Sequence, residues 1–206
     1  VTDCGISHEL IPVITDLQKS DQLKMRIYAM LSDQEANYDY LFRTGAIKTD
    51  RLNVRSFKVY MDGALGSRGA SLLQPYSDKP STSGFLLSDK KHFEEVAIKI
   101  AAKGFQMNTH AIGDSANREI LHVYERVLKG KNDARWRIEH AQHLSPDDMP
   151  RFKEMGVIAS MQGIHCTSDA PFVVKRLGEE RARTGAYAWR SLLDLGVIIA
   201  NGTDAP

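Results

Sequence analysis

Apolar positions along the chain alternate between the period of a helix and that of a strand, which is typical of consecutive βα units. The clearest helix follows Ser88, where apolar residues recur at helical spacing from Phe93 to Ala101 and Gly104 ends the pattern. The predicted strands are residues 1–4, 23–30, 52–60, 105–110, 135–140, 157–161 and the buried run 197–200, and the other predicted helices are residues 8–20, 33–44, 114–130, a late-starting one after residue 145, and 187–195.

Two segments interrupt this alternation, residues 63–87 and 163–185. Both are rich in Gly, Pro and Ser and follow the ends of predicted strands, so we expect long loops that serve a site. Seven βα units without a Gly-x-Gly-x-x-Gly turn favour an α/β fold of the (β/α)8 TIM-barrel type over a doubly wound dinucleotide fold. The sequence therefore predicts that residues 1–206 form one incomplete (β/α)8 barrel domain.

The two ends of the chain shape this expectation. The chain begins at Val1 without a methionine and ends at Pro206 directly after a strand-like run. We therefore expect an internal fragment of a longer protein, with the first barrel strand missing. A barrel that lacks a strand has two unpaired sheet edges. We expect such a piece to be poorly soluble alone, or to pair its edges with a second copy as a homo-oligomer.

The composition narrows the range of partners. Hydrophobic residues make up 42% and charged residues 26% of the 206 residues, which excludes general disorder. The 27 Lys and Arg residues against 26 Asp and Glu residues give a net charge of +1, which argues against a nucleic-acid or membrane-surface partner. No apolar run approaches the roughly 18 residues of a membrane span. Cys4 and Cys166 are the only cysteines, which predicts a reducing, cytoplasmic location.

Candidate chemistry lies at the carboxyl ends of the predicted strands, where every βα loop of a parallel barrel opens. Lys58, His110, His140 and Asp204 all fall there. His110 and His140 are one βα unit apart, so they are expected at similar height on adjacent strands. Two imidazoles so placed suit a divalent metal of the zinc type, which a carboxylate from the last strand could complete. The alternative is a pair of structural histidines.

Lys58 lies within an apolar strand, where a charged ammonium group is costly to bury. A neutral amine can instead add carbon dioxide and form an anionic carbamate, whose two oxygens are able to bridge two metal ions. A snorkelling or salt-bridged lysine is the alternative.

Several separated motifs, in this order, closely resemble the amidohydrolase superfamily. The branch that they resemble is amidohydrolase family 3, which includes N-substituted formamide deformylase-like enzymes. The motifs are KVYMDGALGSRGA at 58–70, HAIGD at 110–114, RIEHAQ at 137–142, MQ at 161–162 followed by His165 and SD at 168–169, and AYAWR at 186–190 with GTDAP at 202–206.

The resemblance implies a metal-dependent hydrolase on a (β/α)8 barrel, with a small β-sandwich domain in the missing ends. It implies that Lys58 is a carboxylated lysine that bridges two zinc-like ions, and that His110 and His140 bind the second ion. Asp204 matches the aspartate that binds the first ion and carries a proton. The family's first ligand pair, His-x-His, is absent from the seven histidines, which are His8, His92, His110, His122, His140, His143 and His165.

The implied reaction is hydrolysis of a C–N bond in a small amide-type molecule, such as an N-substituted formamide. A metal ion brings the pKa of a bound water towards neutrality, and the resulting hydroxide attacks the carbonyl carbon. Asp204 takes the proton and passes it to the leaving nitrogen. The resemblance also places His165 facing the substrate, whereas Asp62 and Arg68 either shape the substrate pocket or have a structural role.

Two other readings stay open. One is a non-catalytic, truncated remnant that keeps the fold and at most one metal ion, and the 206-residue piece alone is expected to be inactive. The other is a phosphoester hydrolase on the same scaffold. Residues 63–69 lack the Gly-Lys-Ser/Thr ending of a phosphate-binding loop. The substrate, the metal identity and the choice between one and two ions are not encoded in any motif of this chain.

Overall fold

The computed structural model describes residues 2–130 and 132–204, with the backbone alone at positions 3 and 4. It divides into two compact units, Val1–Val59 with Lys99–Asn108 and Tyr60–Ile98 with Thr109–Pro206. The first residue of the predicted strand 1–4 and the last two residues of the terminal GTDAP motif lie outside the described residues. Each unit is described by itself below.

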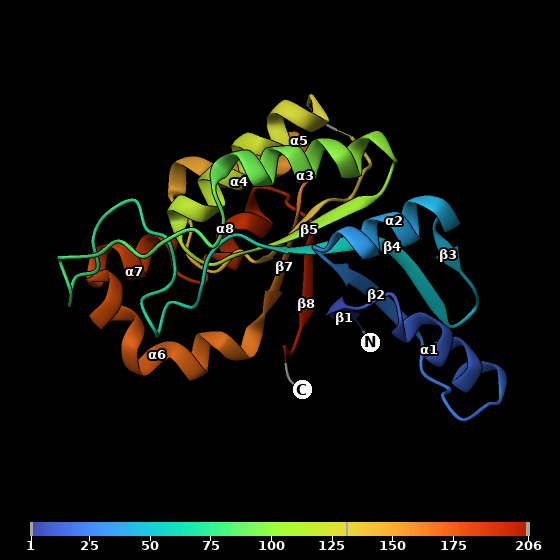
Figure 1. The fold of residues 1–206 in the computed structure, drawn as a ribbon. Coiled ribbons are helices and arrows are strands. Elements are labelled where there is room, and N and C mark those ends of the chain that lie inside the picture. The colour runs from blue at the N-terminus through green and yellow to red at the C-terminus, as the bar shows by residue number, and fades with distance from the viewer. Residues whose placement is uncertain (1, 131, 205–206) are drawn as a thin grey trace. The chain divides into compact units, whose positions relative to one another are not determined.

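Parallel strands separated by helices build the first unit (Figure 1). β1 pairs with β2 and β2 with β4 in parallel, and the short β3 lies antiparallel on β4. Rings of Tyr38, Phe42, Phe57 and Phe105 pack with neighbouring centroids 4.6–5.8 Å apart, and such aromatic packing contributes strongly to a hydrophobic core. The elements are β1 (Thr2–Ile6), α1 (Leu10–Lys19), β2 (Ile27–Ser32), α2 (Glu35–Thr44), β3 (Ile47–Lys48) and β4 (Leu52–Tyr60).

In the second unit the strand order is β5-β6-β7-β8. β6 pairs with β7 and β7 with β8 in parallel, which places Gln162 opposite Gly202 near their carboxyl ends. The elements are α3 (Lys90–Ala102) and β5 (Gln106–Ala111), which run from one unit into the other, then α4 (Asp114–Leu128), β6 (Arg137–His140), the 3₁₀ turn η1 (Pro146–Asp148), α5 (Met149–Met155), β7 (Ile158–Gln162), α6 (Gly163–Leu177), α7 (Glu179–Gly185), α8 (Trp189–Asp194) and β8 (Ile199–Gly202).

Helix α4 illustrates how the sequence pattern produces this packing. Its apolar stripe, which includes Ile120, Leu121 and Tyr124, is buried. Helix α5 is its neighbour (Figure 1), and the polar face of α4 forms ion pairs with the α5 segment. Arg118 on α4 donates to Asp148, which begins the α5 segment. The predicted α/β class, with seven strands in a largely parallel order and helices between them, is confirmed.

The prediction of a long loop over residues 163–185 was wrong, because α6 and α7 occupy it. Glycine, serine and Pro171 suggested a loop, yet Val173 and Leu177 lie on one helical face and are buried against Leu72 and Tyr76 of the 63–87 loop. Tertiary burial therefore overrides the weak local propensity. Gly178, with φ +79°, separates the two helices.

Two smaller predictions also need correction. The last strand was expected as a buried run over residues 197–200, but β8 begins two residues later and 64% of Ile198 is exposed. The two-residue β3 had no periodic signal and was missed. The 63–87 loop does lack helices and regular strands, as predicted.

Within the described ranges, the structure contains no helix with both the length and the apolar character that crossing a bilayer requires.

Candidate metal centre

Two imidazoles lie beside each other at the ends of β5 and β6 in the second unit. His110 is the penultimate residue of β5 and His140 is the last residue of β6. Their ring centroids are 4.5 Å apart in an edge-to-face arrangement. His140 is buried and His110 is mostly buried. The structure thus brings together the two histidines that were predicted at equivalent strand ends.

The backbone turns sharply at His140. His140 and Ala141 have φ angles of +75° and +42°, which residues with a Cβ atom rarely adopt. Such conformations cost on the order of 1–3 kcal/mol each and concentrate at functional sites. The strained turn is therefore an independent sign that the end of β6 carries a function.

Gln162 determines which nitrogen of His140 can act as a ligand. Its Oε1 lies 2.7 Å from His140 Nδ1, and its Nε2 donates to the carbonyl oxygen of Ser160 at 3.3 Å. Because the amide nitrogen is engaged by Ser160, the oxygen faces the ring and accepts a hydrogen bond from Nδ1–H. The neutral His140 ring then carries its lone pair on Nε2, which is the arrangement found in metal-binding histidines whose second nitrogen donates a hydrogen bond.

His165 and Asp204 complete a cluster around His140. One ligand atom from each of His140, His165 and Asp204 lies within 4.8 Å of the others. His165 Nε2 is 3.7 Å from Asp204 Oδ2, and the rings of His140 and His165 are stacked with centroids 5.9 Å apart. His165 was predicted in a loop facing the substrate, but it lies in the first turn of α6.

These distances fit a single divalent ion. Ligand atoms about 2.1 Å from one zinc ion are at most about 4.2 Å from each other. The 3.7 Å separation of His165 and Asp204 already meets this limit, and no pair in the cluster needs to close by more than about 0.6 Å. Two imidazole nitrogens and one carboxylate oxygen are also a donor set that zinc accepts.

Asp62 is buried next to His110. It is 1% exposed, and its two carboxylate oxygens accept the backbone N–H groups of Ser71, Ile112 and Gly113 at 2.8–2.9 Å. Burial raises the pKa of Asp62 to about 7, although these three donors lower it. Its Oδ1 lies 3.7 Å from His110 Nε2. Asp62 therefore holds the loops after β4 and β5 together. Of the two roles that the sequence left open, these contacts fit the structural one.

Arg68 has a similar structural environment. Its guanidinium donates two hydrogen bonds to Asp78 at 3.1 and 2.8 Å, and Arg176 of α6 contacts the same carboxylate. Arg176 also donates to the carbonyl oxygen of Gly66. The two arginines and Asp78 therefore hold the 63–87 loop against α6.

Lys58 belongs to the first unit. It is 3% exposed, near the carboxyl end of β4, and its carbonyl oxygen accepts the N–H of Asp33 at 3.1 Å. The predicted burial of Lys58 is thus observed, and its role as a bridging ligand stays a prediction.

A polar network next to the cluster was not predicted as a unit. Asp169 of α6 accepts the Tyr187 hydroxyl at 2.5 Å and the Gln142 side-chain amide at 3.2 Å. Burial and then Asp169 raise the pKa of Tyr187, so its hydroxyl remains a donor. Gln142 is the last residue of the RIEHAQ motif. Gln162 was missed too, although its place at the end of a predicted strand matches that of His140.

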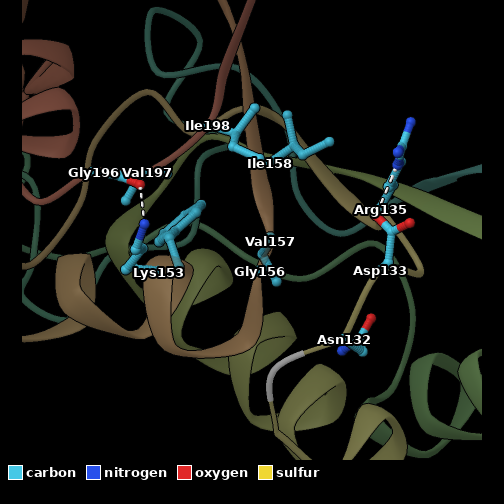
Figure 2. Close-up of a pocket in the computed structure, with 11 residues that line it drawn as sticks. Asn132, Asp133, Arg135, Lys153, Gly156, Val157, Ile158, Gly196, Val197 and Ile198 are labelled. Carbon is cyan, nitrogen blue, oxygen red and sulfur yellow. Dashed lines mark hydrogen bonds and ion pairs between the residues drawn. The ribbon is translucent and has the colours of Figure 1, made fainter.

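A pocket of about 630 Å³ lies elsewhere in the same unit (Figure 2). It is lined at the amino ends of β6, β7 and β8 by residues that include Arg135, Ile158 and Ile198, and Lys153 donates to the Gly196 carbonyl oxygen at its wall. The candidate metal ligands follow the carboxyl ends of the same strands. In parallel barrels the carboxyl ends carry the chemistry, so this pocket is not the candidate site.

Parallel strands with helices between them, and imidazoles and a carboxylate at the carboxyl ends of the strands, define the class of metal-dependent hydrolases. The chain belongs to the amidohydrolase family, whose model matches residues 6–206. The resemblance identified from the motifs is thereby confirmed.

Individual relatives are consistent with this family assignment. The chain is 34% identical over 193 residues to the protein LONG AFTER FAR-RED 3 of Arabidopsis thaliana, covering 93% of this chain and 33% of that protein. It is 38% identical over 151 residues to the putative amidohydrolase YtcJ of Bacillus subtilis (strain 168), covering 73% and 28%. It is 25% identical over 169 residues to the N-substituted formamide deformylase of Arthrobacter pascens, covering 81% and 29%. The chain therefore spans about a third of the length of these relatives.

A solved structure extends the likeness to the fold. The crystal structure of an uncharacterized metal-dependent hydrolase from Pyrococcus furiosus is 33% identical and has a TM-score of 0.88. The match covers 100% of this chain and 42% of that chain.

Proposed function

We propose that this chain supplies the metal-binding part of an enzyme that hydrolyses a C–N bond of a small amide-type molecule, with N-substituted formamides as the first candidates. The observation that carries the proposal is the cluster of His140, His165 and Asp204 at and just after the ends of parallel strands, with the His110 ring beside His140. Membership of the amidohydrolase family and the relative named a formamide deformylase support the substrate class.

The proposed roles follow from the position of each residue. A bound divalent ion, which we propose is zinc, supplies Lewis acidity that polarises the substrate carbonyl and lowers the pKa of water. Buried His140, held in its Nδ1–H form, and neighbouring His110 present neutral nitrogen donors. Asp204, whose side chain is 50% exposed, can take a proton from the attacking water and return it to the leaving nitrogen.

We propose that the side chain of Lys58 carries a carbamate. Its buried amine would add carbon dioxide and release one proton, which gives an anionic oxygen ligand. A second ion would then be possible. We also propose a cytoplasmic location and pairing between copies of this chain.

The test uses the full-length protein. After elemental analysis for bound metal, the hydrolysis of N-substituted formamides and of phosphotriesters is measured before and after chelation. We expect metal-dependent formamide hydrolysis, and Asp204→Asn to reduce kcat by about 10²–10⁴-fold, while Asp147→Asn at an exposed position leaves it unchanged. Formamide hydrolysis that persists without metal, or turnover of phosphotriesters alone, would contradict the proposal.

A further inference from the structure

We propose that His165 is itself a ligand of the metal ion, forming a three-residue centre with His140 and Asp204 in place of a purely substrate-facing role. The proposal rests on the proposed function only in requiring that an ion binds at this site. Its basis is the mutual proximity of the three ligand atoms, all within 4.8 Å.

The start of α6 holds His165 close to Asp204. The pairing of Gln162 with Gly202 joins β7 and β8, His165 follows Gln162 by three residues, and Asp204 follows Gly202 by two. The side chain of Asn201 on β8 accepts the N–H of Gly163 at 3.1 Å, which anchors the first turn of α6 to β8. Short connections from a paired strand position leave both ligands little freedom.

The Asp169 network holds the same helix to the segment that follows His140. Asp169 lies one helical turn after His165, and it is bound by Tyr187 and by Gln142, two residues after His140. His140 and His165 are therefore fixed to each other through α6 as well as through their stacked rings. Preorganised ligands of this kind lose less entropy when an ion binds.

The chemistry of the cluster favours a divalent cation of the zinc type. Two neutral imidazoles and one carboxylate give three protein ligands, the number that catalytic zinc sites use while a fourth position stays open. His165 Nε2 lies 3.7 Å from Asp204 Oδ2, close enough for both atoms to bind one cation after a small adjustment. A histidine that served substrate alone would not need to lie within ligand distance of both other residues.

The experiment measures zinc affinity of the full-length protein by competition with a chromophoric chelator, and records the visible spectrum of the cobalt(II) form. His165→Ala and His165→Gln should raise the zinc Kd by at least about 10-fold and change the cobalt spectrum. His165→Cys, which keeps a zinc ligand, should recover most of the affinity. His122→Gln on α4 is the matched control and should bind like the wild type.

A second variant separates ligation from folding. Asn201→Ala removes the anchor of α6 without removing a ligand and should weaken binding less than His165→Ala, whereas Asn201→Asp retains the acceptor and should bind nearly as the wild type does. Circular dichroism and metal-free thermal unfolding check that the variants fold.

The outcomes distinguish the two proposals. Wild-type zinc affinity and an unchanged cobalt spectrum in both His165 variants would overturn the ligand role and leave the proposed hydrolase function standing. A wild-type protein that binds no divalent ion would overturn both.

Discussion

His140 Nδ1 and Gln162 Oε1 lie 2.7 Å apart, and the carbonyl oxygen of Ser160 orients the glutamine amide so that its oxygen faces the ring. One residue at the end of β7 therefore sets the tautomer of the imidazole at the end of β6. Hydrogen bonds of this kind to metal-binding histidines affect metal affinity strongly.

Gln162→Leu should raise the zinc Kd by about 10–100-fold, because Nδ1–H loses its acceptor and the ring orientation is no longer fixed. Gln162→Glu keeps an acceptor and should stay close to the wild type. Chelator competition on the full-length protein measures both, with the exposed Gln74→Leu as the control. Unaltered affinity in Gln162→Leu would show that the contact does not act on the metal site.

Asp62→Asn should destabilise the protein by about 2–4 kcal/mol. Both carboxylate oxygens accept backbone N–H groups, so the new amide NH₂ must face a donor and leaves it unsatisfied. Urea unfolding gives the change in free energy, and exposed Asp89→Asn is the control. A change below about 1 kcal/mol would mean that the three N–H groups find other acceptors.

Gly113→Ala should destabilise the protein by about 3 kcal/mol or more. A Cβ atom at this position would lie 1.9 Å from the carbonyl oxygen of Ser71, which is backbone and cannot rotate away. The HAIGD motif thus needs glycine for close approach of two loops. Gly202→Ala is the matched control for thermal unfolding, because among the described residues, its chain neighbours aside, no atom lies within 4 Å of the new Cβ. Equal stability in the two variants would argue against the close approach.

The buried pair of Asp114 and His143, 3.4 Å apart, predicts sensitivity to acid. Burial raises the pKa of Asp114, but His143 and the N–H groups of Leu73 and Ser115 outweigh it and bring the pKa below its usual 3.8. The unfolded chain therefore binds this proton first as the pH falls. The stability that ionised Asp114 contributes is present above about pH 4 and is lost as the pH falls through the lower, folded-state pKa.

Urea unfolding between about pH 3 and pH 6 tests this dependence. Asp114→Asn should unfold with a shallower dependence on pH below about pH 4 than the wild type, and exposed Asp147→Asn should follow the wild type. The same acid slope in Asp114→Asn and the wild type would exclude Asp114 as its source.

Local pattern was sufficient for much of the fold. The strand over 52–60 was predicted with the bounds of β4, and the helix after Ser88 corresponds to α3. Both have strong periodicity and clear end signals. The helices over residues 163–185 could not be predicted, because their propensity is poor and their stability comes from burial against the distant 63–87 loop.

By itself, the sequence determined that His110 and His140 end adjacent strands, because a spacing of one βα unit in a parallel arrangement leaves little choice of position. It also determined the family, through motifs that are fixed in order. Only the tertiary structure decided that Gln162 orients His140, that Asp62 accepts hydrogen bonds from backbone N–H groups, and that His165 lies in one cluster with His140 and Asp204. Most of these contacts connect residues about 20 to 60 positions apart, and packing rather than local periodicity brings such residues together.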